Sequence, residues 1–298
     1  MRRPNFFIVG APKAGTSAMD YYLSQHPEVF MAEKELHYFA PDFIFDERYR
    51  RDLDGYLAYF RDAADEPVVG ESSVFYLRSE IAVRSIHEFC PEAKILIHIR
   101  NPVDFMVSHH SQLLYVDLED IEDFRTAYEA QSNRRQGKQM SRRCRCPAVL
   151  QYTELGQFSH QIKRYYDTFG REQVLVNVFD EFSGDTLGTY RRTLDFLAVD
   201  TAFTPEMPVV NANKTVRSKH LMRFIRNTPD WVTKGSHILL PPQARENLKR
   251  RVRHWNTRQE QRVPLDPEFK HRLQQEFVPE VERLSALLDR DLTGWCRS

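Results

Sequence analysis

The sequence lacks the features that mark membrane-spanning and disulfide-stabilised proteins. No run among its 298 residues approaches the roughly 20 apolar residues that a bilayer-spanning helix needs. The N-terminal segment MRRPNFFIVGAPKAG contains no apolar stretch of the kind that a signal peptide carries. Only four cysteines occur, which is too few for a disulfide framework in a chain of this length. We therefore expect a soluble, cytoplasmic protein that does not insert into a membrane.

An excess of charge of either sign is absent as well. Lys+Arg and Asp+Glu each number 42, so the formal net charge is +0. This balance gives no reason to expect a nucleic-acid partner, and a preference for anions must come from local clusters. One cluster is the segment 133–146, which has six basic residues and no acidic one, and we expect a mobile basic loop there. A solvated loop and a lid that faces an anion both fit this composition. Cys144 and Cys146 lie in it without neighbouring ligand residues, so we expect no metal site.

The alternation of short apolar runs with longer helical patterns predicts an α/β fold. The runs 6–10, 94–99 and 173–179 are rich in β-branched residues, which is typical of central strands in a parallel sheet, and 67–73 is a weaker candidate. With 41% hydrophobic residues and no low-complexity linker, the chain can bury one large core. We predict a single domain over 1–298, with a central parallel β-sheet flanked by helices. The expected helices are 17–25, 80–89, 102–114, 155–169, 186–197 and 267–288.

Two of these helices have informative details. Asn101 and Pro102 are an N-cap residue followed by a proline at the first helical position, which marks the start of one helix clearly. In the last helix, Leu273, Phe277 and Leu284 recur at helical spacing. This apolar stripe predicts a helix that packs on the sheet.

The first predicted strand leads into a loop with two glycines, GAPKAGTS at 10–17. Glycine permits backbone conformations that turn several N–H groups into one concavity, and the following helix adds the partial positive charge of its N-terminus. A phosphate-type anion fits such a site. We expect it to be held by the backbone at Ala14 and Gly15 and by the hydroxyls of Thr16 and Ser17. A tight turn without a ligand is the alternative.

This loop departs from the nucleotide-triphosphate loop GxxxxGK[ST] in a consistent direction. Gly10 and Gly15 keep the glycine spacing, but Thr16 occupies the lysine position and the lysine lies inside the loop as Lys13. The strand 94–99 is followed by Arg100 rather than by an aspartate that completes a magnesium site. Positive side chains take the place of a metal, so we expect an anion with less charge than a triphosphate and no required metal.

These motifs resemble those of the sulfotransferases that use 3′-phosphoadenosine 5′-phosphosulfate (PAPS). PKAGTS after a strand resembles the family's 5′-phosphosulfate loop. IRNPVDFMVSHHSQLL (99–114) resembles its 3′-phosphate motif, in which Arg100 closes a strand and Ser108 follows in the next helix. NANKTVRSKHL (211–221) is similar to a late cofactor-covering loop that includes Arg217.

Further segments resemble the glycan-type and bacterial members of that family. HPEVFMAEKELHYF (26–39) is similar to a Lys-Glu signature, and ESSVFYL (71–77) is similar to the loop on the acceptor side. The stretches 155–182 and 287–295 also look like the family. The resemblance covers nearly the whole chain, with separate motifs in the family's order. It implies a P-loop-like fold and transfer of a sulfuryl group from PAPS to a hydroxyl of a sugar or small-molecule alcohol.

Sulfuryl transfer needs positioned reactants, a base for the acceptor hydroxyl and neutralisation of charge on the leaving phosphate. Lys13 suits the leaving group, which departs as adenosine 3′,5′-bisphosphate (PAP). Arg100 and Ser108 suit the 3′-phosphate. The resemblance implies Glu35 as the base, and His37 is the second candidate, because both face the same side if the segment is extended.

Two other functions fit the same loop. A nucleotide-dependent phosphotransferase would require magnesium, and a nucleotide-binding protein without turnover would bind the donor but never release free PAP. The remaining histidines carry less information. We expect His98, inside a strand, to be a core residue, and His109 and His110 to serve in packing or in acceptor contacts.

Overall fold

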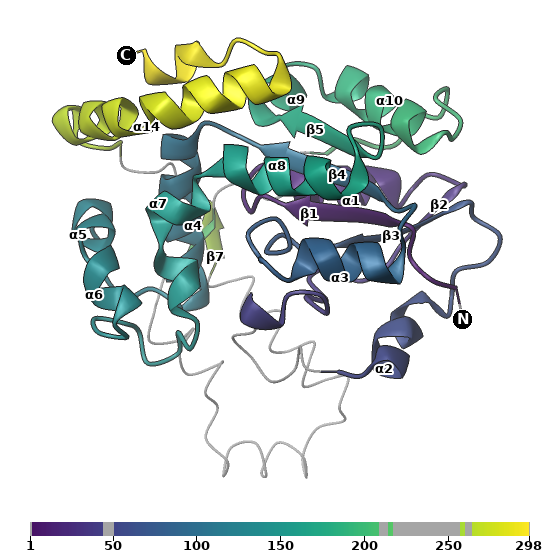
Figure 1. Cartoon of the computed structure of the whole chain (residues 1–298), viewed down its shortest axis with the longest axis horizontal. Coiled ribbons are helices and arrows are strands. Elements are labelled where there is room, and N and C mark those ends of the chain that lie inside the picture. The colour runs from purple at the N-terminus through teal and green to yellow at the C-terminus, as the bar shows by residue number, and fades with distance from the viewer. Residues whose placement is uncertain (1, 44–50, 209–213, 217–256, 260–263, 298) are drawn as a thin grey trace, which may run out of the picture.

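A five-stranded parallel sheet with the order β2-β3-β1-β4-β5 forms the centre of the molecule (Figure 1). The computed structural model describes residues 2–43, 51–208, 214–216, 257–259 and 264–297. The strands are β1 (Phe6–Gly10), β2 (Val29–Met31), β3 (Val68–Ser72), β4 (Lys94–Ile99) and β5 (Val174–Val178). The predicted α/β fold with a central parallel sheet is confirmed. Sequence reasoning missed β2, because three residues are too short for a strand pattern to stand out.

Helices cover both faces of this sheet. The α-helices are α1 (Thr16–Leu23), α2 (Leu53–Leu57), α3 (Ala82–Phe89), α4 (Pro102–Val116), α5 (Phe124–Glu129), α6 (Gln131–Arg135), α7 (Tyr152–Leu155), α8 (Phe158–Phe169), α9 (Phe179–Gly184), α10 (Thr186–Leu197) and α14 (Pro267–Leu288). Short 3₁₀ turns are η1 (Pro41–Phe43), η3 (Ala58–Phe60), η4 (Pro147–Leu150) and η5 (Thr293–Cys296). Alternate residues of β1 enter two separate cores: Phe6 and Ile8 pack with α1 and α10, whereas Phe7 and Val9 pack with α3 and α8.

The last helix does not pack where the sequence placed it. The stripe Leu273, Phe277 and Leu284 is buried, but α14 lies mainly against α8 and α4. Phe277 fits beside Gly156, where an added Cβ would come within 3.0 Å of the phenyl ring. Figure 1 shows α14 running along the top of the molecule, beyond β5, where its main contacts are to other helices.

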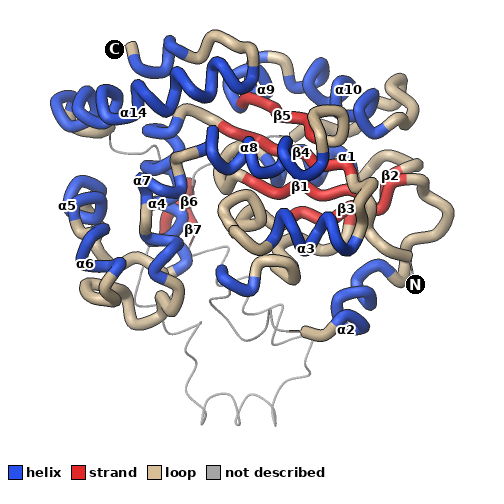
Figure 2. The backbone as a smooth tube through the Cα atoms, in the orientation of Figure 1, coloured by secondary structure: helices blue, strands red, loops and turns tan. Residues whose placement is uncertain are grey.

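A two-stranded antiparallel ladder joins β6 (Lys214–Val216) to β7 (Thr257–Gln259). Figure 2 shows it beside α4, and β6 contacts that helix. The segment that resembles a late cofactor-covering loop therefore returns to the helix that carries Ser108. Arg217 itself lies outside the described residues.

Candidate active site

The predicted site residues gather at the carboxyl ends of three neighbouring strands. The loop 10–15 follows β1, Ser72 ends β3, and Arg100 follows β4. Because these strands are parallel and adjacent in the sheet, their carboxyl ends meet at one edge, which is where α/β sheets bind ligands. The structure therefore brings these predicted segments to one edge of the sheet, and their role there stays a prediction.

The loop after β1 has the shape of an anion site. Gly10 has a φ of 147°, and a Cβ there would lie 2.6 Å from the Val74 carbonyl oxygen. Gly15 has a φ of 92° and is the N-cap of α1, where no side chain caps the helix. The first N–H groups of a helix have no acceptor within it, so those of Thr16 and Ser17 suit an anion together with the helix dipole.

Side chains from β4 and its end fix the shape of this loop. His98 is fully buried and donates from Nδ1 to the Ala14 carbonyl oxygen at 3.2 Å. Burial lowers the pKa of His98 to about 4, so its ring is neutral at physiological pH. Arg100 donates from Nη1 to the Lys13 carbonyl oxygen at 3.2 Å. The prediction that His98 is a core residue is confirmed, and its ring also anchors the loop, which its place inside a strand did not reveal.

Arg100 keeps a donor available for a ligand. Its guanidinium lies 4.7 Å from the centre of the Phe179 ring, and Nη2 lies 3.7 Å from Asp104. Nε is buried and has no hydrogen-bond partner within the described part of the chain. Burial lowers the pKa of Arg100, with Asp104 opposing the shift, yet an arginine stays charged under any ordinary condition. A buried cation with an unused N–H fits a phosphate oxygen.

Lys13 and helix α4 lie together on the other side of the loop. Lys13 has a φ of 64°, and its Nζ donates to Gln112 Oε1 at 3.4 Å. Ser108 lies one helical turn before Gln112, so the two share a face of α4. Ser108 is fully buried on that face. The next residue, His109, points elsewhere, toward the Val149 carbonyl oxygen at 2.9 Å, and burial lowers its pKa to about 4. Sequence reasoning missed Gln112, although its spacing of four from Ser108 was a usable signal.

Glu35 and His37 lie side by side, as expected, but the backbone between them is not in the extended conformation assumed from the sequence. His37 Nε2 lies 3.2 Å from Glu35 Oε2, which also accepts the Val74 N–H at 3.2 Å. The segment is not an extended strand: Glu35 and His37 have φ values of 64° and 53°, in the left-handed region. The Glu35 side chain is 33% exposed and that of His37 is 2% exposed, so only the carboxylate reaches solvent.

The protonation of His37 follows from its surroundings. Burial lowers the pKa of His37, and the nearby Glu35 carboxylate only partly opposes this shift. A neutral imidazole carries one N–H, and an ionised carboxylate can only accept. The neutral His37 ring thus lies with Nε2 facing the Glu35 carboxylate, a position from which it can orient that carboxylate.

Two further charged groups surround this pair. Lys34 donates from Nζ to Ser72 Oγ at 2.5 Å, which holds an ammonium group at the end of β3. Asp20 lies on α1, and its Oδ1 is buried without a partner among the residues that the structure describes. Burial raises the pKa of Asp20 to about 6, with Lys34 opposing the shift and Glu35 adding to it. Sequence reasoning did not select Asp20, because an acid within an amphipathic helix usually faces water.

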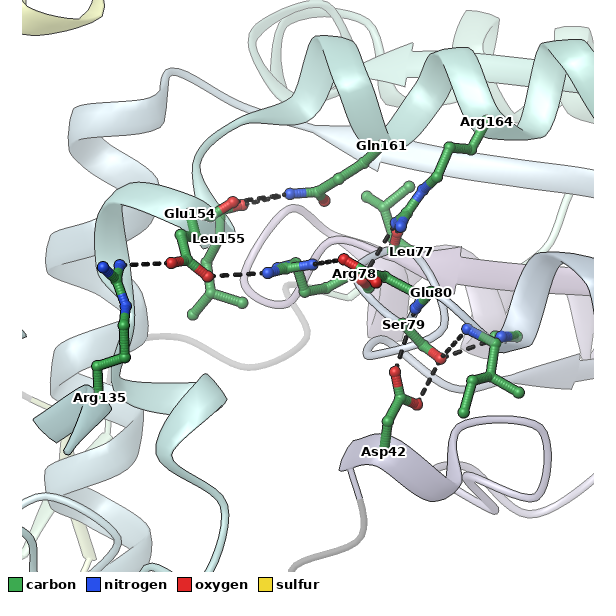
Figure 3. Close-up of polar contacts among 12 residues, drawn as sticks. Asp42, Leu77, Arg78, Ser79, Glu80, Arg135, Glu154, Leu155, Gln161 and Arg164 are labelled. Carbon is green, nitrogen blue, oxygen red and sulfur yellow. Dashed lines mark hydrogen bonds and ion pairs between the residues drawn. The ribbon is translucent and has the colours of Figure 1, made fainter. Parts of the chain in front are cut away.

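The basic segment 133–146 is less cationic than its composition suggests. Arg134 is fully buried and donates to Glu119 Oε1 at 2.7 Å, so its charge is neutralised inside the fold. Arg135 lies 2.6 Å from Glu154, which also binds Arg78 at 2.9 Å (Figure 3). Four basic side chains in the segment are exposed: Arg135, Lys138, Arg142 and Arg145. The mobility of the segment stays a prediction.

The two cysteines in this segment are buried thiols. Cys144 Sγ contacts the Cys146 carbonyl oxygen at 3.3 Å, and Cys146 Sγ contacts the Asp42 carbonyl oxygen at 3.7 Å. Burial raises the pKa of both thiols, that of Cys144 to about 11. Across the described ranges, no three His, Cys, Asp or Glu side chains gather in a way that could hold a metal ion. Nor does the described part contain a helix long and apolar enough to cross a bilayer.

Comparison with known proteins decides the family. A family model described as the sulfotransferase domain matches residues 3–223, well over half of the chain. The chain belongs to the sulfotransferase family. It is similar over its whole length to the crystal structure of a sulfotransferase from Alicyclobacillus acidocaldarius, with 31% identity, a TM-score of 0.75 and 100% of both chains covered. The resemblance drawn from the motifs is thereby confirmed.

Curated members of the family match a shorter part. Heparan sulfate glucosamine 3-O-sulfotransferase 6 from Homo sapiens is 33% identical over 113 residues, which are 38% of this chain and 31% of that protein. Membrane-associated sulfotransferase kil1 from Dictyostelium discoideum is 27% identical over 111 residues, which are 36% of this chain and 22% of that protein. Because these matches span a minor part of each relative, they show a shared family rather than a shared substrate.

Proposed function

We propose that this family member transfers the sulfuryl group of PAPS to a hydroxyl of a sugar or small-molecule acceptor and releases PAP. One arrangement carries the proposal. A cationic anion-binding loop follows β1, and the turn bearing a partly exposed carboxylate, Glu35, is bonded to the end of the neighbouring strand β3 through Glu35 N–H and the Ser72 carbonyl oxygen at 2.8 Å. A donor phosphate and a general base thus share one edge of the sheet.

The donor side suits a nucleotide with separate 5′- and 3′-phosphates. The N-terminus of α1, with Thr16 and Ser17, would bind the 5′-phosphate, and Lys13 would neutralise charge on the leaving group as the sulfur–oxygen bond breaks. Arg100 has a buried, unused Nε–H for the 3′-phosphate, and Ser108 would add a hydroxyl. No metal-dependent step is proposed, because Arg100 stands where a triphosphate site would have its magnesium-binding aspartate, and Lys13 adds a positive charge inside the loop.

Glu35 is the better candidate for the general base. One oxygen of its carboxylate is held by the Val74 N–H and by His37, while Oε1 accepts no hydrogen bond from the described residues. A carboxylate that is held through one oxygen and open at the other can accept the proton of an acceptor hydroxyl. His37 is buried and its Nε2 lies 3.2 Å from Glu35 Oε2, which favours an orienting role.

A glycan is the acceptor class that the relatives support. Heparan sulfate sulfotransferases are among them, and a glycan of that kind is anionic. Exposed basic side chains such as Arg142 fit an anionic chain, and the segment that bears them reaches Asp42 through Cys146. A neutral sugar or a small alcohol would use the same base and donor.

The direct test is incubation with PAPS, labelled in the sulfuryl group, and a panel of glycan and alcohol acceptors. Mass spectrometry should detect an added sulfonate together with an equal amount of PAP, with chelator present. A requirement for magnesium with ATP as donor would favour the phosphotransferase alternative. Tight PAP binding without any PAP production, across the whole panel, would favour a binding protein without turnover.

A further inference from the structure

A buried acid, Glu71, lies directly behind the turn that carries Glu35. It belongs to β3, opposite Phe7 of β1, and is fully buried. No lysine or arginine pairs with it within the described part of the chain. Three hydroxyl groups surround its carboxylate instead: Tyr56 at 2.5 Å from Oε2, and Ser73 and Tyr76 each at 2.7 Å from Oε1. An acid in this position is costly to bury, so its retention calls for a function.

Two of these hydroxyls also hold the backbone of the turn. Ser73 Oγ accepts the His37 N–H at 3.0 Å, and the Tyr76 hydroxyl accepts the Phe39 N–H at 3.3 Å. A hydroxyl has one proton, and a backbone N–H can only donate. Each hydroxyl therefore directs its proton to Glu71 and leaves a lone pair for the turn. The carboxylate thus sets the direction of both hydrogen bonds.

The turn needs such support. Glu35 and His37 both occupy the left-handed region, which is unfavourable for residues other than glycine and persists only where the surroundings enforce it. The His37 backbone is held by Ser73, and the His37 ring in turn lies 3.2 Å from Glu35 Oε2. A continuous chain of contacts runs from Glu71 through Ser73 and His37 to the Glu35 carboxylate.

We propose that Glu71 is a positioning residue that orients Glu35 for proton removal, acting through the Ser73 and Tyr76 hydroxyls on the 35–39 turn. The inference rests on the proposed function, in which Glu35 is the base. Glu71 touches no substrate in this scheme. Glu71 acts as a hydrogen-bond acceptor of fixed orientation, and its negative charge is not required.

Two substitutions at Glu71 separate its role as a hydrogen-bond acceptor from its negative charge. In Glu71→Gln the amide nitrogen can face Tyr56, whose hydroxyl holds no backbone group in the described structure, while the amide oxygen still accepts from Ser73 and Tyr76. Glu71→Leu removes both oxygens. We expect Glu71→Gln to keep kcat within about threefold of wild type and Glu71→Leu to lose about tenfold to a hundredfold, as misplacement of a catalytic group does. Equal losses in both variants would overturn the proposal.

Ser73→Ala gives the same test without disturbing the buried acid, and it decides the matter if Glu71→Leu fails to fold. It should lower kcat about tenfold or more and leave the Kd for PAP within about twofold, measured by calorimetry. Tyr165→Phe is the matched control, because it removes a buried hydroxyl that donates to the Tyr76 carbonyl oxygen at 2.9 Å but does not hold the turn. It should lower Tm and leave kcat unchanged. A Ser73→Ala variant that behaves like Tyr165→Phe would reduce Ser73 to a structural role and overturn the inference.

A double-mutant cycle separates this inference from the proposed function. If Ser73 acts through Glu35, then Ser73→Ala in a Glu35→Gln background should cost little further kcat, although it costs about tenfold in wild type. The same loss in both backgrounds would show that Ser73 acts elsewhere. Full activity of Glu35→Gln alone would instead overturn the assignment of the base. An absence of any sulfuryl transfer by wild type would overturn the proposed function itself.

Discussion

The two halves of the candidate active site are held by different kinds of contact. The donor half centres on one continuous loop, whose shape comes from its own glycines and from two side chains at the end of β4. Gly10 and Gly15 have positive φ, and His98 and Arg100 donate to loop carbonyl groups. The proposed ligand-binding groups are the N–H groups and side chains of the loop together with Arg100 and Ser108, so a substitution among them should act on the ligand directly.

The acceptor half is held from outside its own sequence. The turn at 35–39 depends on Ser73 and Tyr76, and these depend on Glu71, all more than 30 positions away along the chain. This half can therefore be disabled by residues that never touch a substrate. The comparison teaches that changes in the acceptor half should lower kcat and leave donor affinity intact.

The largest expected effect is at Glu35. Glu35→Gln keeps the shape of the side chain and removes its basicity, so kcat should fall by roughly 10²–10⁴-fold while PAP binding stays intact. Steady-state kinetics and calorimetry measure the two quantities. His37→Ala is the control and should cost less, because it removes only the orienting contact. If His37→Ala abolishes turnover while Glu35→Gln stays active, His37 is the base.

Lys13→Ala tests whether the donor half also acts in the transition state. Loss of one such contact typically costs about 3–4 kcal/mol of barrier, so kcat should fall by about 10²–10³-fold. The Kd for PAP should change much less, because the charge that Lys13 neutralises develops only as the bond breaks. A kcat within about tenfold of wild type, which is about 1.4 kcal/mol, would rule out this role.

Arg100→Ala should change donor discrimination rather than chemistry. Removal of a charged hydrogen bond costs about 1.5–3 kcal/mol, so the preference for PAPS over its analogue without the 3′-phosphate should fall about tenfold to a hundredfold. Competition binding with PAP and adenosine 5′-phosphate measures this ratio. Because Arg100 also holds the Lys13 carbonyl group, Tm serves as the control for folding. Equal losses for both nucleotides would contradict the assignment.

Asp20→Asn should reveal a buried acid through the pH dependence of stability. The pKa of Asp20 is about 6 in the fold and 3.8 ordinarily, so the folded protein binds this proton more tightly. The free energy of unfolding therefore falls as pH rises from about 4 to about 6, by about 3 kcal/mol at most. Asparagine does not ionise, so the variant should not show this decrease in the free energy of unfolding. Urea unfolding should show the variant to be more stable at pH 8 and indistinguishable at pH 4; a difference that is equal at both pH values would contradict the shift.

The smallest effect is expected in the basic segment. Arg142→Gln with Arg143→Gln removes two charges that would attract an anionic acceptor without touching the reacting atoms. Screened surface pairs contribute about 0.2–1 kcal/mol each, so KM for such an acceptor should rise only a few-fold, and added salt should reproduce the change in wild type. An unchanged KM for every confirmed acceptor would reduce the segment to a solvated loop.

Local sequence was sufficient for four of the five strands and for the loop after β1. β-Branched runs predicted β1, β3, β4 and β5, and the glycine spacing with a following helix predicted the anion loop. These features follow from neighbours in the chain, because strand period, glycine dihedrals and helix ends are properties of short segments. The start of α4 at Pro102, with Asn101 accepting the Val103 N–H, is another case.

Tertiary structure alone decided the roles of the buried polar residues. Arg134 looked like part of a basic loop, either solvated or facing an anion, yet it is neutralised by Glu119 inside the fold. Glu71 belongs to a weaker strand candidate and to a segment that resembles the acceptor-side loop, yet the fold buries its carboxylate among the hydroxyl groups of Tyr56, Ser73 and Tyr76. The physical reason is that burial and pairing depend on which distant side chains share a low-dielectric space, and a sequence pattern does not encode that neighbourhood.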